Sequence, residues 1–262
     1  MKEDKKVAIV TGASGTIGRA ISAGMASHGH AVVMVGRNSE RLVQAAAAVK
    51  REAPNAEVRA EIVDVSRRVE VDAFAKSWLG PLAVLINNAA IAPRRRSETP
   101  EGIEMQLATN VLGYVWMMRA FEAVLRASAP ARVVNVASYW AGDLDLDDLQ
   151  FGTRPYNNDT AYRQSKQADR MLTVAFAKRW SSSEITVNSC HPGDASSTLS
   201  NSLGYGGHET PEEAAATPIW LATDAKVAGV TGKYFAGCEQ RRCEFATDEK
   251  AIAALDAICA KF

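Results

Sequence analysis

The arrangement of residues 7–36 constrains the fold of this chain more than any other segment. Residues 7–11, V-A-I-V-T, form a short run rich in β-branched residues, which is typical of a buried strand. G-A-S-G-T-I-G follows, then a helical pattern, and then a second apolar run, A-V-V-M-V-G, at 31–36. This order of strand, glycine-rich turn, helix and strand is the context in which such glycines bind a dinucleotide. A plain tight turn between strand and helix is the alternative.

The glycines of this turn have separate expected roles. Gly12 allows the tight turn, a further glycine lets the backbone approach a pyrophosphate, and Gly18 lets the helix pack closely on the strand. The N-terminus of the helix attracts the phosphates. The expected phosphate contacts come from Gly12, Ser14, Gly15, Thr16, Ile17 and Gly18.

The residue after the second strand discriminates between the two nicotinamide cofactors. An NAD site usually has an acidic residue there, which holds the ribose 2′-hydroxyl. This chain has Gly36-Arg37-Asn38, and no acid until Glu40. The planar guanidinium of Arg37 suits a 2′-phosphate, and a solvated arginine at a helix start is the alternative. We therefore predict NADP(H), contacted by Arg37 and Asn38, with NAD(H) as the second choice.

Strand and helix patterns alternate along the rest of the chain. Further strands are predicted at 57–63, 81–87, 131–137, 184–190 and 232–236, and helices at 39–52, 67–78, 101–127, 159–180, 210–223 and 248–260. Such alternation produces a parallel sheet that is covered on both faces. No linker, composition shift or internal repeat divides the sequence. We predict one α/β Rossmann-fold domain over residues 1–262, a doubly wound parallel sheet of about seven strands.

Tyr162 and Lys166 stand four residues apart in the helical stretch A-Y-R-Q-S-K-Q-A-D-R-M-L, so they share one helix face. A phenol has a reference pKa of about 10, and a nearby ammonium lowers that pKa. The pair could therefore run acid–base chemistry at a substrate oxygen. Because the spacing occurs by chance in many helices, a packed tyrosine beside a solvated lysine is the better explanation of the pair taken alone.

Seven motifs follow one another along the chain. They are T-G-A-S-G-T-I-G at 11–18, Asp64-Val65, N-N-A-A at 87–90, Asn110 in A-T-N-V-L-G, Ser138 in V-V-N-V-A-S, the pair Tyr162 and Lys166, and H-P-G at 191–193. As an ordered set, over about residues 5–237, they resemble the short-chain dehydrogenase/reductase family. G-I-E-M-Q-L-A-T-N-V-L-G, S-A-P-A-R-V-V-N-V-A-S, L-D-L-D-D-L and T-G-K-Y-F further resemble its retinol dehydrogenase-like branch. That branch includes retinol and carbonyl reductases, WW-domain oxidoreductases and protochlorophyllide reductases.

The resemblance implies a catalytic set and a cofactor site. The catalytic set is Asn110, Ser138, Tyr162 and Lys166. Tyr162 would exchange a proton with the substrate oxygen, Ser138 would orient that oxygen, Lys166 would lower the pKa of Tyr162 and hold the nicotinamide ribose, and Asn110 would order a water. Further cofactor contacts would come from Asp64, Val65, Asn88, Ala89, Ala90, Tyr162, Lys166, Pro192, Gly193 and Ser197.

Three segments depart from the family pattern. Gly15 and Thr16 exchange the residue types that the family's short form usually has, so we expect a slightly different backbone path in the phosphate loop. Ala90 replaces the glycine of N-N-A-G. After H-P-G the family's amide-binding threonine could align with Ser197 or with Thr198.

Composition excludes several other classes. The 262 residues have a formal net charge of zero and no concentrated basic face, so the electrostatic footprint of a nucleic-acid partner is missing. Arg94-Arg95-Arg96 could bind an acidic substrate at the mouth of the site, although solvated loop charges are the simpler interpretation.

No apolar run has the length of a membrane span, and M-K-E-D-K-K leads directly into the first strand without a signal peptide. The four cysteines lack C-x-x-C spacing, which predicts free thiols, no metal and a cytoplasmic location.

We therefore predict an NADP(H)-dependent alcohol dehydrogenase or carbonyl reductase that acts on a small apolar substrate. The alternative is a catalytically weak NADP(H)-binding sensor or scaffold. Residues 144–152 should lie at the rim of the site and 194–209 should form a mobile lid. Many relatives form tetramers by pairing the helix that bears Tyr162 and Lys166 with its copy in another subunit. Here the long gap of 24 positions between Ser138 and Tyr162 and the polar residues expected on the outward face of that helix favour a monomer or dimer; these residues are Arg163, Gln167, Arg170 and Lys178.

Overall fold

Eight strands form one sheet in the computed structural model, which describes residues 5–262. Their spatial order is β3-β2-β1-β4-β5-β6-β7-β8. The strands are β1 (Val7–Thr11), β2 (Ala31–Gly36), β3 (Val58–Ile62), β4 (Val84–Asn87), β5 (Ala131–Val136), β6 (Ile185–Cys190), β7 (Tyr234–Ala236) and β8 (Glu239–Arg241). Most of the M-K-E-D-K-K segment, residues 1–4, lies outside the described residues. The order runs outward in both directions from β1 and β4, which confirms the predicted doubly wound fold.

The sheet differs from the prediction by one strand within residues 5–262. β8 pairs antiparallel with β7, whereas every other neighbouring pair is parallel. Ala236 pairs with Glu239, so only Gly237 and Cys238 form the turn, with φ angles of 61° and 56°. Positive φ at both central positions is the pattern of a tight hairpin turn. All of E-Q-R in β8 is exposed, so no apolar alternation announces this strand.

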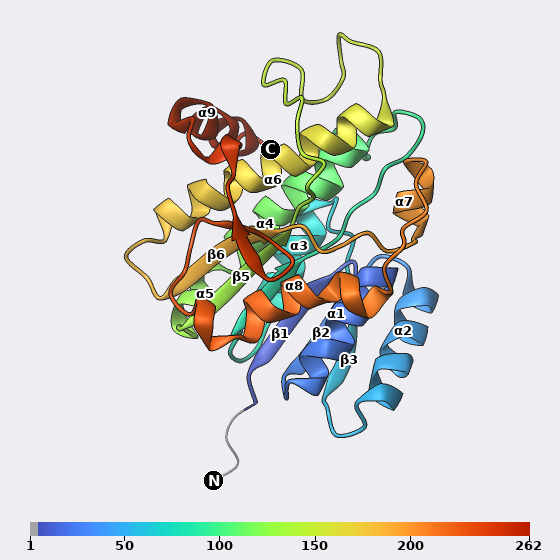
Figure 1. Cartoon of the computed structure of the whole chain (residues 1–262), viewed down its shortest axis with the longest axis vertical. Helices are drawn as coiled ribbons and strands as arrows, with labels where there is room; N and C mark the ends of the chain where they lie inside the picture. The colour runs from blue at the N-terminus through green and yellow to red at the C-terminus, as the bar shows by residue number, and fades with distance from the viewer. Residues whose placement is uncertain (1–4) are drawn as a thin grey trace.

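Helices cover both faces of the sheet (Figure 1). They are α1 (Thr16–Ser27), α2 (Ser39–Glu52), α3 (Arg68–Ser77), α4 (Gly113–Ala120), α5 (Glu122–Ala127), α6 (Asn158–Arg179), α7 (Thr198–Ser202), α8 (Pro211–Thr223) and α9 (Glu249–Cys259). α1 packs between α2 and α8 on one face, while α3, α4, α6 and α9 pack together on the other. Residues 5–262 also contain two short 3₁₀ turns, η2 (Ala225–Val227) and η3 (Glu244–Ala246).

Alternate residues of the central strands supply the two cores. In β1, Ile9 packs with the α4 and α6 side, whereas Ala8 and Val10 pack with the α1 and α8 side. Successive side chains of a strand point to opposite faces, so a strand covered on both faces must be apolar throughout. The continuous apolar runs in the sequence therefore indicated these strands correctly.

The helix predicted at 101–127 is broken in the structure. Leu107–Leu112 (η1) form a turn of π-helix, and α4 and α5 follow with an interruption at Phe121. π-helical turns are rare and occur frequently at functional sites. Here the turn carries Asn110, one of the predicted site residues. None of the helices within residues 5–262 has the length and apolar character needed to cross a membrane.

Candidate active site

The glycine-rich loop after β1 leaves no room for side chains at two of its glycines. Gly12 has φ of 64°, and a Cβ there would lie 2.7 Å from the Cα atom of Ala89. A Cβ at Gly18 would overlap the carbonyl oxygen of Gly12 and lie 2.7 Å from Asn88 Nδ2. Asn88 Nδ2 also donates to the carbonyl oxygen of Thr11 at 2.9 Å. The structure thus joins the N-N-A-A segment to the loop.

The N-terminus of α1 fits the phosphates of a dinucleotide. α1 begins at Thr16, and its N-cap residue Gly15 provides no side-chain hydrogen bond to the first turn. The first backbone N–H groups of a helix have no partner within the helix, so they are free to bind an anion. Gly15 has extended backbone angles, which any residue can adopt, and a Cβ there would lie 3.3 Å from the Gly12 oxygen. A glycine at this position, where the family usually has another residue, therefore causes no strain.

The residues after β2 and β3 lie where the adenosine half of the cofactor is expected. The Arg37 side chain is 57% exposed, and its Nη1 lies 4.0 Å from Asp64 Oδ2. Asp64 Oδ1 accepts hydrogen bonds from the backbone and hydroxyl of Ser66. Asn38 caps α2 by accepting from the Arg41 backbone, and Val65 is buried in the core. Of this group, Arg37 is the side chain that extends most freely from the protein.

Ser138 and Tyr162 meet in a cavity of about 340 Å³ at the carboxyl edge of the sheet. Ser138 follows β5, and Tyr162 lies in the second turn of α6, which Asn157 caps by accepting from the Thr160 backbone. Burial raises the pKa of the Tyr162 phenol well above its usual value, and a hydrogen bond with Ser138 opposes part of that increase. Tyr162 is therefore a phenol, and not a phenolate, in the ligand-free protein.

The cavity around these two residues is lined by aromatic and apolar side chains and also by polar ones, among them His191, Asp194 and His208. Trp140 and Tyr205 meet edge to face with ring centroids 4.1 Å apart, and Leu199 and Leu203 lie beside them. Tyr205 belongs to segment 194–209, which includes α7 and is joined to α6 by a 3.1 Å hydrogen bond from Asn158 Nδ2 to the Ser202 oxygen. Residues of the segment line the cavity, and its role as a mobile lid stays a prediction.

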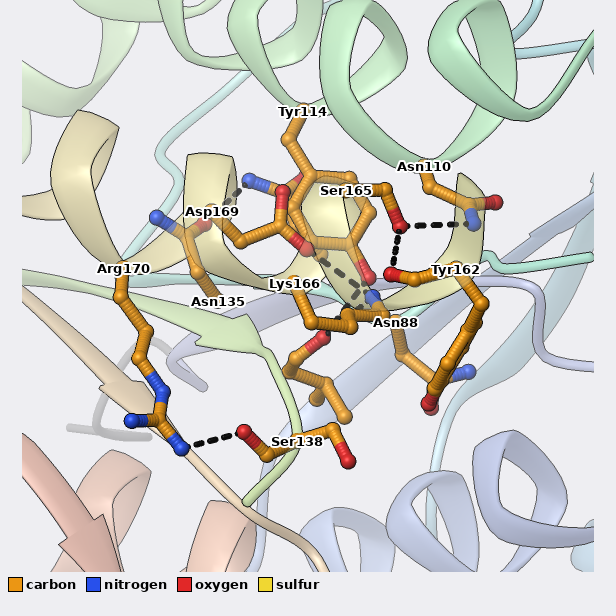
Figure 2. A network of polar contacts seen from close by, with 12 residues as sticks. Asn88, Asn110, Tyr114, Asn135, Ser138, Tyr162, Ser165, Lys166, Asp169 and Arg170 are labelled. Carbon is orange, nitrogen blue, oxygen red and sulfur yellow. Dashed lines mark hydrogen bonds and ion pairs between the residues drawn. The ribbon is translucent and has the colours of Figure 1, made fainter. Parts of the chain in front are cut away.

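Lys166 is fully buried beside Tyr162, where it pairs with a carboxylate that the sequence had not indicated (Figure 2). Its Nζ atom donates to the Val136 oxygen and to Asp169 Oδ2, both at 2.9 Å, and lies 5.8 Å from the centre of the Tyr162 ring. Burial opposes the charged form of Lys166, but Asp169 and Tyr114 together raise the pKa of Lys166. That Lys166 lowers the pKa of Tyr162 stays a prediction.

Asn110 ties three segments together at the back of the site (Figure 2). Its Oδ1 accepts from the Ile91 backbone N–H at 2.9 Å. Its Nδ2 donates to the Ile91 oxygen at 3.0 Å and to Ser165 Oγ at 3.1 Å. The side chain thus links η1 to the segment after β4 and to α6, and a role in ordering water stays a prediction.

The H-P-G segment follows β6 at the same edge of the sheet. His191, Pro192 and Gly193 all line the cavity. Gly193 has φ of 147°, and a Cβ there would lie 2.8 Å from the Cα atom of Ala214, so this position requires glycine. Ser197 lines the cavity and caps α7 by accepting from the Ser200 backbone at 3.1 Å, whereas Thr198 is absent from the residues that line it.

Two neighbouring residues of α6 make buried contacts that the sequence did not reveal. Asp169, buried against Lys166, was not singled out, although its position three residues after the lysine on the same helix was the available signal. Arg170 was assigned to the outward face of α6, but the structure corrects this. It is buried, stacks 3.6 Å above the Tyr234 ring and donates to the Ser138 carbonyl oxygen. The segment after β7 covers that face, which a helical pattern alone cannot show.

The arginine run at 94–96 does not reach the cavity. Arg96 donates to the Gln150 oxygen at 3.0 Å and to Glu98 at 2.6 Å, so it fastens the rim loop. Within residues 5–262, the side chains lining the cavity include none of the three arginines. A structural role therefore explains Arg96 better than contact with an acidic substrate.

Known proteins resemble this chain in sequence and in fold. The family model described as short chain dehydrogenase matches residues 6–205. A Streptomyces lividans protein named "Probable oxidoreductase" is 37% identical and covers 90% of this chain and 86% of its own length. Human retinol dehydrogenase 13 is 33% identical, with 90% and 77% covered. A solved Pseudomonas aeruginosa RhlG/NADP active-site complex has a TM-score of 0.71 and 26% identity over 88% of this chain and 94% of that one.

These matches and the site define the class of protein first: an oxidoreductase enzyme with an NAD(P)-binding fold. The chain belongs to the short-chain dehydrogenase/reductase family, in its retinol dehydrogenase-like branch. The family resemblance inferred from the ordered motifs is thereby confirmed.

Proposed function

We propose that this protein is an NADP(H)-dependent oxidoreductase that interconverts an alcohol and a carbonyl on a small apolar substrate. The observation that carries the proposal is the meeting of Ser138 and Tyr162 in one cavity. Ile17, from the start of α1, lines the same cavity, so the phosphate loop borders it. Leu199, Leu203 and the aromatic rings beside them suit an apolar substrate body.

The chain's own residues supply proton transfer and orientation. In the reducing direction the Tyr162 hydroxyl donates its proton to the substrate oxygen, and in the oxidising direction it accepts one. The Ser138 hydroxyl donates a hydrogen bond to the same oxygen. When bound, the nicotinamide cofactor supplies or accepts the hydride, and the protein positions it. Gly12, Gly18 and the N-terminus of α1 would hold its phosphates.

Arg37 supports the choice of NADP(H). Its exposed guanidinium extends from the end of β2, and Gly36 and Asn38 beside it provide no carboxylate for a ribose 2′-hydroxyl. The Pseudomonas aeruginosa RhlG structure is a complex with NADP, which agrees with this choice. The free thiols of Cys190, Cys238, Cys243 and Cys259 support the proposed cytoplasmic location.

The test is a panel of aldehydes, ketones and alcohols, followed through NADPH absorbance. We expect turnover of at least one apolar carbonyl, with a rate that depends on Tyr162. The second candidate, a sensor or scaffold, predicts tight NADPH binding and no turnover of any compound. The presence of both Tyr162 and Ser138 in the cavity favours the enzyme.

A further inference from the structure

Asp169 is the acidic group closest to the proposed catalytic pair (Figure 2). Its Oδ2 atom accepts a hydrogen bond from Lys166 Nζ at 2.9 Å, and the exposed fractions of the two side chains are 0% and 1%. Asp169 Oδ1 has no hydrogen-bond partner within residues 5–262. Burying two charges is costly, so an ion pair at this depth requires an explanation beyond stability.

The hydrogen bonds of the Lys166 ammonium show how Asp169 holds this side chain. One hydrogen bond goes to the Val136 oxygen and one to Asp169, and the Tyr114 hydroxyl also faces the ammonium. Asp169 is therefore the charged group among these partners of Lys166. Without Asp169, the lysine would be a buried cation with a backbone carbonyl and a phenol as its remaining partners.

Titratable groups from several elements face this pair. They are Tyr162 on α6, Tyr114 on α4, Cys190 at the end of β6, Cys259 on α9 and Asp194 after β6. Burial raises the pKa of both thiols and both phenols, which keeps all four neutral near pH 7. Asp194 acts on Tyr162 but not on Lys166. Arg170 points away, toward Ser138 (Figure 2). Burial also raises the pKa of the Asp169 carboxyl to about 7, and Lys166 opposes that increase. Because the 2.9 Å contact favours the charged form of each partner, Asp169 is the carboxylate that balances Lys166 within the described chain.

We propose that Asp169 is a positioning residue for this reaction: it holds Lys166 in place and balances its charge, so that Lys166 and Tyr162 both keep their protons. This inference rests on the proposed function, in which Tyr162 must carry a proton to reduce a carbonyl. Loss of the negative charge should expose Tyr162 to an unbalanced ammonium 5.8 Å from its ring, which favours the phenolate.

The decisive variant is Asp169→Asn. Its amide oxygen can still accept a hydrogen bond from Lys166, so the variant removes charge while preserving shape. A purely structural role for Asp169 predicts no change in the titration of Lys166 or Tyr162. Asp72→Asn, which removes an exposed partner of Arg68 on α3, is the matched control for loss of one carboxylate.

The first measurement uses the cofactor-free protein. Carbon-13 labels at lysine Cε and tyrosine Cζ report ionisation by NMR, with the signals assigned through Lys166→Arg and Tyr162→Phe. In Asp169→Asn we expect the first proton to leave this pair at a pH lower by about one unit or more, because a nearby charge shifts pKa values by about one to three units. Unchanged titration of both residues would overturn the proposal.

The second measurement is the pH profile of carbonyl reduction with NADPH. The alkaline limb of kcat/KM should move to lower pH in Asp169→Asn and stay near its wild-type position in Asp169→Glu and Asp72→Asn. An alkaline limb that does not move in Asp169→Asn would refute the role of Asp169. If no carbonyl is turned over by the wild-type protein, the proposed function fails, and the NMR titration still decides whether Asp169 controls the two protons.

Discussion

At the scale of single residues, the Tyr162 hydroxyl is the group on which turnover should depend most. Tyr162→Phe removes the proton donor and keeps the buried ring, so we expect kcat to fall by at least about a hundredfold, the usual minimum for general acid catalysis. NADPH should still bind, which a fluorescence titration can measure. Tyr156→Phe, at a tyrosine that does not line the cavity, is the matched control and should keep near-normal turnover. A Tyr162→Phe enzyme with more than roughly a tenth of the normal rate would contradict the acid role.

We expect the charge of Arg37 to set the preference between the two cofactors. Arg37→Asp should raise the dissociation constant of NADPH by roughly ten- to a hundredfold, since hydrogen bonds to a charged group contribute about 1.5–3 kcal/mol. Binding of NADH should be preserved or improved. Arg51→Asp, at the far end of α2, makes the same change in net charge away from the site and should leave the preference intact. Equal dissociation constants for the two cofactors in the unmodified protein would show that Arg37 does not select.

At the scale of elements, the joint between β1 and α1 depends on the absence of a side chain at Gly18. A Cβ in Gly18→Ala would lie 2.7 Å from Asn88 Nδ2 and overlap the Gly12 carbonyl, so helix and loop must move apart. Overpacking of this kind costs about 1–3 kcal/mol of stability. Gly15→Ala, in the same loop, meets one atom at 3.3 Å and should unfold close to the wild-type temperature. Thermal unfolding of the two variants measures the difference, and equal transitions would mean that the close approach is not strained.

The elements also show which parts of the fold are readable from sequence. The strands with continuous apolar runs, such as β1 and β2, were predicted at their observed positions because burial on both faces leaves a strong pattern. β8 was not predicted because its residues are exposed. The helix at 101–127 was predicted too long because the amino-acid composition of the π-helical turn η1 does not distinguish it from an α-helix. The hydrophobic pattern of a segment indicates which of its faces is buried, but not which other element packs against that face.

The same limit applies to the site. Ser138, Tyr162 and Lys166 could be identified because motif order along the chain signals them. Asp169 and Arg170 could not be interpreted, because polar residues on a long helix usually indicate a solvated face. α6 is instead covered on several sides, by β5, η1, η3 and α9, so these polar residues became buried partners of Lys166 and Ser138.

At the scale of the whole molecule, the covering of α6 bears on assembly. Many short-chain relatives pair this helix with its copy in another subunit, as the resemblance to the family implied. Here the chain itself occupies part of that surface (Figure 1). α9 packs along α6, where Lys178 pairs with Glu249 at 3.6 Å and Arg179 pairs with Asp256. The segment before α6 adds an ion pair of 2.9 Å between Asp143 and Arg163.

These intrachain contacts lead us to expect a monomer or a weak dimer. Gln167 accepts from the Leu144 backbone at 3.1 Å, so even the middle of α6 is engaged by the segment that precedes it. A helix pairing across two subunits would have to displace α9 and this segment and leave their charged partners unpaired, which is costly in a buried interface. Light scattering at micromolar concentration should therefore give a mass near 28.1 kDa, or an average between one and two chains that rises with concentration. A stable particle of four chains that persists on dilution would show that the tetramer forms through other surfaces or that α9 moves aside.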